Sequence, residues 1–110
     1  MIIDVINDRG KTLVIEKHDY GIRVYLDDPN SHDSFFIKDD ENNPGWCVVA
    51  IEKDFEAVDF VDEEYSNFGV NNLSELISLF QENPSLGWEM LTGDKIKIDH
   101  VKIVEEKEPF

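Results

Sequence analysis

The residue types best suited to chemistry in this sequence are its three histidines and its single cysteine. His32 lies in a polar loop between Asp28 and Asp33, and carboxylates together with imidazole suit many divalent metal ions. Their spacing matches no metal-binding pattern, and Asp and Asn side chains in such loops commonly form hydrogen bonds within turns. We therefore expect a solvated loop here and no metal site.

The acidic run from Asp39 to Asn43 has the oxygen-rich composition of a calcium-binding loop. Counted from Asp39, the sixth position lacks the required glycine. Counted from Asp40, Gly45 falls at that position, but Pro44 then occupies a ligand position and Ile51 stands where the bidentate Glu belongs. The pattern excludes a calcium loop.

Cys47 lies within the apolar run Trp46–Ile51 of a strongly acidic chain. A reactive thiolate needs exposed, electropositive surroundings, so we expect Cys47 to be a small buried residue. There is no Gly-rich phosphate loop and no Ser-centred nucleophile elbow, and 25 acids place some carboxylates close together by chance. We therefore expect a protein that is not an enzyme, holds no cofactor and takes no small-molecule substrate.

The balance of charge excludes several partners. The chain has 25 acidic and 10 basic side chains, for a net charge of -15. Direct binding to nucleic acid or to an anionic membrane needs Lys and Arg, so both are disfavoured. No apolar run approaches the roughly 20 residues of a spanning helix, and residues 1–7 contain Asp4 and no basic leader. With one cysteine and no internal disulfide, the expected location is the cytoplasm.

The negative charge is concentrated in one part of the sequence. Residues 27–64 hold 13 acids and two lysines, whereas residues 95–110 are neutral. In an extended chain, Glu52, Asp54 and Glu56 would project from one face about 6 to 7 Å apart. Such a row repels itself unless a cation neutralises it, although charged runs also serve solubility alone. We expect a basic partner to bind these residues: Asp39, Asp40, Glu41, Glu52, Asp54, Glu56, Asp59, Asp62, Glu63 and Glu64.

The elements that must position these acids are short strands. A chain of this length suits a single domain, 1–110, with residues 105–110 as a frayed tail. For residues 55–65 both strand and helix are open, and a strand is favoured because it leaves a short connection. A type II turn is expected at Asn43–Trp46 and a bulge near Asp99 and His100. The expected strands are 1–7 paired as a hairpin with 11–17, then 22–26, 34–38, 46–51 and 95–104.

One amphipathic helix is predicted over residues 73–82. Asn72 and Glu75 form a variant of the capping box, and Pro84 stops the helix. The apolar stripe falls at positions i, i+3, i+4 and i+7. The predicted class is α+β: a single domain with a predominantly antiparallel curled sheet or partial barrel of six to seven short strands, with this helix packed on it.

The overall size and charge, the acidic segment from Asp39 to Glu64 and the capped helix from Asn72 to Glu82 resemble the immunity proteins of bacterial toxin systems, such as contact-dependent growth inhibition systems. The resemblance implies a protein that binds a basic cognate toxin, a nuclease, and occludes its cationic cleft. Complementary charge would accelerate that encounter. The alternative is a phage-type mimic of nucleic acid that inhibits a restriction or CRISPR-type defence enzyme.

Overall fold

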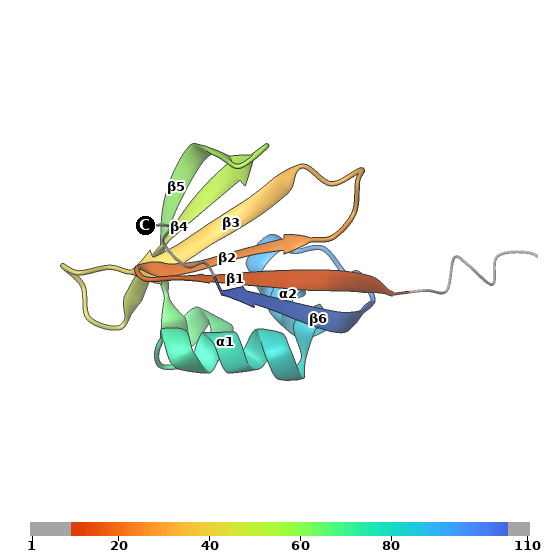
Figure 1. Cartoon of the computed structure of the whole chain (residues 1–110). Coiled ribbons are helices and arrows are strands. Elements are labelled where there is room, and N and C mark those ends of the chain that lie inside the picture. The colour runs from red at the N-terminus through yellow and green to blue at the C-terminus, as the bar shows by residue number, and fades with distance from the viewer. Residues whose placement is uncertain (1–9, 106–110) are drawn as a thin grey trace, which may run out of the picture.

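One six-stranded sheet with helices on a single face makes up the fold (Figure 1), in a computed structural model that describes residues 10–105. The strand order is β5-β4-β3-β2-β1-β6. Neighbouring strands are antiparallel except β1 and β6, which are parallel. The elements are β1 (Lys11–His18), β2 (Gly21–Leu26), β3 (Asp33–Asp39), β4 (Trp46–Lys53), β5 (Glu56–Glu64), the 3-10 helix η2 (Tyr65–Phe68), α1 (Leu73–Glu82), α2 (Pro84–Thr92) and β6 (Ile98–Glu105).

The α+β class and the predominantly antiparallel sheet of six strands are confirmed, and the sheet does not close into a barrel. The prediction of a single helix was incomplete. Asn83 ends α1 and also begins α2, because its side chain accepts a hydrogen bond from the backbone N–H of Leu86. Pro84 occupies the first turn of α2, where its missing N–H costs nothing. Proline therefore stops one helix and starts the next.

The helix α1 confirms its predicted bounds and cap. The side chain of Asn72 accepts from the backbone N–H of Glu75 at 2.8 Å. The carboxylate of Glu75 accepts in return from the backbone N–H of Asn71 at 3.0 Å, one residue before the cap. Leu76 and Phe80 are fully buried on the apolar stripe, so α1 packs on the sheet as its spacing required.

Two of the predicted local irregularities are confirmed. Trp46 donates its backbone N–H to the carbonyl of Asn43 at 3.0 Å, and Gly45 has a φ of 85°, as a type II turn needs. In the β1–β6 ladder the partner of Lys11 is Ile98 and that of Thr12 is His100, so Asp99 is the extra residue of a bulge.

The structure describes only the second strand of the hairpin that was predicted at the amino end. Its first strand, residues 1–7, lies outside the described residues, as does most of the tail predicted at 105–110. Its second strand is β1, whose two edges pair with β2 and β6.

Within the segment 55–65, Glu56–Glu64 form a strand, as favoured, while Phe55 lies in the turn before it and Tyr65 begins η2. β5 turns back on β4 through Asp54 and Phe55, which have φ values of 53° and 65°. Two consecutive residues at positive φ define a type I′ turn, the geometry that matches the twist of a tight hairpin.

The two faces of the sheet differ. The face toward α1 and α2 carries the core, which the side chains of β1, β2, β3 and β4 fill together with those of the helices. The register places the alternate residues on the other face, which no helix covers (Figure 1). The largest fully buried side chains of the core are Phe80, Leu13, Ile15, Ile22, Ile37 and Leu76.

Candidate functional site

The edge strand β5 is the most exposed element of the sheet. Among residues 10–105, β5 pairs with β4 alone, so its outer edge is free. Three large apolar groups of this hairpin are open to solvent: Phe55 is 57%, Val58 65% and Phe60 66% exposed. Exposed apolar groups gathered on one element commonly mark an interaction surface. We call β5 with its turn, residues 54–64, the hairpin surface.

The acids of β5 surround these apolar groups on both faces. The pairing of Val61 with Val49 of the core places Asp59 and Glu63 on the helix side. Phe60 and the acids Asp62 and Glu64 therefore project from the uncovered side. In the described part of the chain, no acid of β5 forms an ion pair with Lys, Arg or His. Within residues 10–105, the acids of β5 thus carry a negative charge that no ion pair neutralises.

The expected row of Glu52, Asp54 and Glu56 does not exist. The chain reverses at Asp54, so Glu52 lies on β4 and Glu56 on β5. Glu52 lies on the face of the sheet that no helix covers, but it is only 5% exposed there, so a partner cannot reach it. Glu52 is therefore left out of the docking residues proposed below, because it is buried and Arg23 already neutralises its charge.

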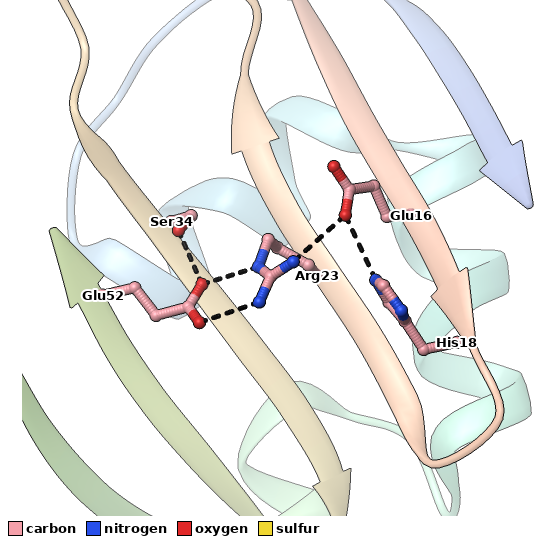
Figure 2. A network of polar contacts seen from close by, with 5 residues as sticks. All are labelled: Glu16, His18, Arg23, Ser34 and Glu52. Atoms are coloured by element: carbon pink, nitrogen blue, oxygen red, sulfur yellow. Dashed lines mark hydrogen bonds and ion pairs between the residues drawn. The ribbon is translucent and has the colours of Figure 1, made fainter. Parts of the chain in front are cut away.

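Arg23 of β2 neutralises Glu52 (Figure 2). Its Nε donates to Glu52 Oε1 at 2.8 Å and Nη2 to Oε2 at 3.1 Å, and the hydroxyl of Ser34 donates to Oε1 at 2.7 Å. Nη1 of the same guanidinium donates to Glu16 on β1 at 3.2 Å. Glu16 also lies 3.1 Å from His18. The network joins four adjacent strands, from β1 to β4, across the uncovered face.

These contacts shift the acidity of both main partners. The hydrogen bonds that Arg23 donates to Glu52 are the largest cause of the raised pKa of Arg23. Burial alone would raise the pKa of Glu52, but the hydrogen bonds from Arg23 and Ser34 outweigh it and hold that pKa below its ordinary value. Both groups stay charged near neutral pH, so the pair is an electrostatic brace and not an acid–base couple.

Arg23 also holds the turn of the hairpin surface. Its guanidinium carbon lies 5.7 Å from the centroid of the Phe55 ring and 5.4 Å from that of Phe36. The edge of the Tyr25 ring meets the Phe55 ring with centroids 5.5 Å apart. The buried network therefore positions the exposed turn through aromatic contacts, at a distance that favours cation–π attraction.

The other expected acids, Asp39, Asp40 and Glu41, lie near the end of β5 that is farther from the turn at Asp54 and Phe55. Asp39 pairs in register with Cys47, which pairs with Glu63, so the β3–β4 turn adjoins the end of the hairpin surface. Asp39 accepts a hydrogen bond from the buried Tyr65 hydroxyl, and Asp40 accepts from the backbone N–H of Asn42 at 3.0 Å. Asp39, Asp40 and Glu41 line a shallow hollow with Trp46 and Tyr65.

The structure separates the remaining chemical candidates. In residues 10–105 no group of three or more His, Cys, Asp or Glu side chains is placed to hold a metal ion. His32 contacts Asp54 at 2.9 Å in an exposed pair. Cys47 is fully buried, and this burial, followed by the charges of Glu63 and Asp39, raises the pKa of its thiol to about 12. No helix among the described residues is long and apolar enough to cross a membrane.

Sequence reasoning missed the apolar part of the site. Among the aromatic residues, Trp88 and Tyr65 are buried in the core and Trp46 is 36% exposed. Phe55 and Phe60 are both more exposed than these three side chains. Their signal in the sequence is an apolar residue at every second or third position among acids, which a helix and an exposed strand share.

Comparisons with protein-family models, with curated proteins and with solved structures found no match to this chain.

Proposed function

We propose that this protein binds and neutralises a basic protein through its hairpin surface, in the manner of the immunity proteins that it resembles in size and charge. The partner would be a cognate toxin, a nuclease whose phosphate-binding cleft is lined with Lys and Arg. A cytoplasmic site of action fits the single unpaired Cys47, because disulfides are rare in that compartment. The proposed docking residues are Asp39, Asp40, Glu41, Asp54, Glu56, Asp59, Asp62, Glu63 and Glu64.

One observation carries the proposal: within residues 10–105, exposed apolar side chains and acids that form no ion pair occupy the same edge strand. Phe60 and Val58 are each about two thirds exposed, and acids flank them on both faces. Apolar anchors surrounded by charge are the usual composition of a protein interface. Acids without counter-ions raise the rate of encounter with a basic surface, an effect that salt weakens.

The same observation disfavours the mimic of nucleic acid. Phosphate imitation needs acids spread along an elongated face, whereas three of the exposed residues at the centre of this strand, Val58, Phe60 and Val61, are apolar. At the opposite edge of the sheet, β6 carries both Lys102 and Glu105 and so has no single sign of charge.

The proposal is tested by capture and by a matched pair of variants. The tagged protein, expressed in its native cells, should retain the basic polypeptide encoded by the adjacent reading frame and inhibit its nuclease activity. The variant Glu56→Gln/Asp59→Asn/Asp62→Asn should weaken this complex about tenfold or more at 150 mM salt, which is about 1.4 kcal/mol.

The control removes the same charge elsewhere. Asp19, Glu82 and Asp94 are exposed and lie outside the hairpin surface. The variant Asp19→Asn/Glu82→Gln/Asp94→Asn has the same net charge as the test variant, so it should bind within about threefold of the unmodified protein. Equal losses in the two variants would show that only total charge matters, and no loss in either would refute the assigned surface.

A further inference from the structure

The outer edge of β5 presents backbone groups as well as side chains. Tyr65 donates its backbone N–H to the carbonyl of Gly45 at 2.9 Å, and Asp40 donates to the carbonyl of Trp46 at 3.0 Å. Backbone groups alternate in direction along an antiparallel strand. Glu63 and Val61, like Tyr65, therefore direct their N–H and C=O groups toward β4. The N–H and C=O groups of Phe60, Asp62 and Glu64 point away from the sheet.

A second contact supports this assignment. The backbone N–H of Phe60 donates to the carboxylate of its own neighbour, Asp59, at 2.9 Å. An N–H engaged in the ladder with β4 would not be available for that bond, so this group faces outward. Toward the turn, the register shift between Ile51 and Glu52 makes Val58 an extra residue, and the regular edge ends there. Among the residues that the structure describes, the open edge therefore runs from Phe60 to Glu64.

From this geometry we propose that the partner contributes an extended basic segment, which pairs with residues 60–64 and extends the sheet by one strand. Main-chain hydrogen bonds give such strand addition its affinity, and side chains on alternate faces give it specificity. Acids lie on both faces of β5, with Asp62 and Glu64 on one and Asp59 and Glu63 on the other. An incoming strand with Lys or Arg therefore meets a carboxylate on either face.

The same charges select against a second copy as the occupant. Two β5 edges placed side by side would bring carboxylates against carboxylates, and like charges on paired strands destabilise the pairing. A basic strand would also replace Phe60 N–H as the partner of the Asp59 carboxylate, which frees that N–H for the new ladder. This inference rests on the proposed function, because it names how the basic partner occupies the hairpin surface.

The test uses the whole protein and a defined probe, the blocked peptide Lys-Val-Lys-Val-Lys-Val-Lys, at millimolar concentration. Amide hydrogen exchange is followed by NMR. Binding should slow exchange at the outward amides of Phe60, Asp62 and Glu64 by about fivefold or more, since each gains a hydrogen-bond partner. The inward amides of Val61 and Glu63 serve as internal controls and should change little.

A pair of variants at one position separates the backbone from the charge. Asp62→Asn keeps the outward N–H, whereas Asp62→Pro removes it at an edge position that tolerates proline. We expect the proline variant to bind the peptide at least about fivefold more weakly than the Asn variant. If the proline variant does not fold, the exchange measurement on the unmodified protein still decides.

The outcomes distinguish the two proposals. Binding of the Lys peptide without slower exchange at the outward amides, or no binding at all, would overturn strand addition. If a peptide with Ser in place of Lys protects the same amides equally well, strand addition stands and the role of charge in the proposed function fails. If the outward amides of the protein alone become protected as its concentration rises, a second copy is the occupant and the inference is wrong.

Discussion

Replacing Glu52 with Gln should destabilise this protein far more than replacing any exposed acid. The Glu52 carboxylate is 6% exposed and accepts two hydrogen bonds from Arg23 and one from Ser34. Breaking a fully buried ion pair costs about 3–5 kcal/mol. Arg23 is 22% exposed and keeps its bond to Glu16, so we expect a smaller loss of about 2–3 kcal/mol for Glu52→Gln.

Urea unfolding followed by circular dichroism measures this loss. With a slope of about 1–2 kcal/mol per molar urea for a protein of this size, the midpoint should fall by about 1–3 M. Asp54→Asn is the matched control, because the His32–Asp54 pair is 59% and 71% exposed and should contribute no more than about 0.5 kcal/mol. Equal effects of the two substitutions would refute the idea that the network braces the sheet.

The pH dependence gives an independent check. The pKa of Glu52 lies below its ordinary value of 4.5 in the folded protein. A carboxyl group with a depressed pKa stabilises the fold above its unfolded pKa, and that stability is lost as the pH falls through the folded pKa. The difference in unfolding free energy between the unmodified protein and Glu52→Gln should therefore be constant near neutral pH and shrink below about pH 4. A difference that persists undiminished into acid would point to packing and not to charge.

Three further predictions follow from individual contacts. Gly87→Ala would favour a helix by propensity, but its new Cβ would lie 2.6 Å from the buried Phe80 ring. The free energy of unfolding should therefore fall by about 1–3 kcal/mol. A melting temperature higher than that of the unmodified protein would contradict this packing. Iodoacetamide at pH 8 should label Cys47 much more slowly in the folded protein than in guanidinium chloride, because the thiol is buried and its pKa is raised to about 12; equal rates by mass spectrometry would place the thiol at the surface. Tyr65→Phe keeps the buried ring but removes the hydrogen bond to Asp39. The free energy of unfolding, measured by chemical denaturation, should fall by about 1 kcal/mol. An unchanged denaturation midpoint would show that this hydrogen bond does not stabilise the fold.

The features that the sequence predicts well are those with a local cause. The bounds of α1 follow from Asn72 and an apolar stripe within ten residues, and the turn at Pro44–Gly45 follows from two residues with restricted or special backbone angles. The bulge at Asp99 follows from a change of phase within one strand. In each case the interacting groups are close in sequence, so the local pattern of residue types is enough to predict the structure.

The features that the sequence hides depend on distant partners or on a turn without its usual residues. Type I′ turns favour Asn-Gly, whereas this hairpin places Asp54 and Phe55 at positive φ, so the reversal that breaks the acidic row has no strong local signal. The burial of Glu52 depends on Arg23, which lies 29 residues away in the chain and two strands away in the sheet. Thirteen acids between residues 27 and 64 look alike in the sequence, and only pairing shows which one is internal.

The acids of β5 can both protect the edge and recognise a partner, and the two effects have the same physical origin. An exposed strand of nine residues with Val58, Phe60 and Val61 on it would pair readily with another copy if it were neutral. Carboxylates on both faces of β5 repel those of a second copy and so destabilise that pairing. An incoming strand of the opposite charge meets no such repulsion. Edge protection alone would need no exposed aromatic ring, and Phe60 is exposed with acids on either side. Protection of the edge therefore accounts for the acids but not for the exposed Phe60 ring, whereas the proposed basic partner would account for both.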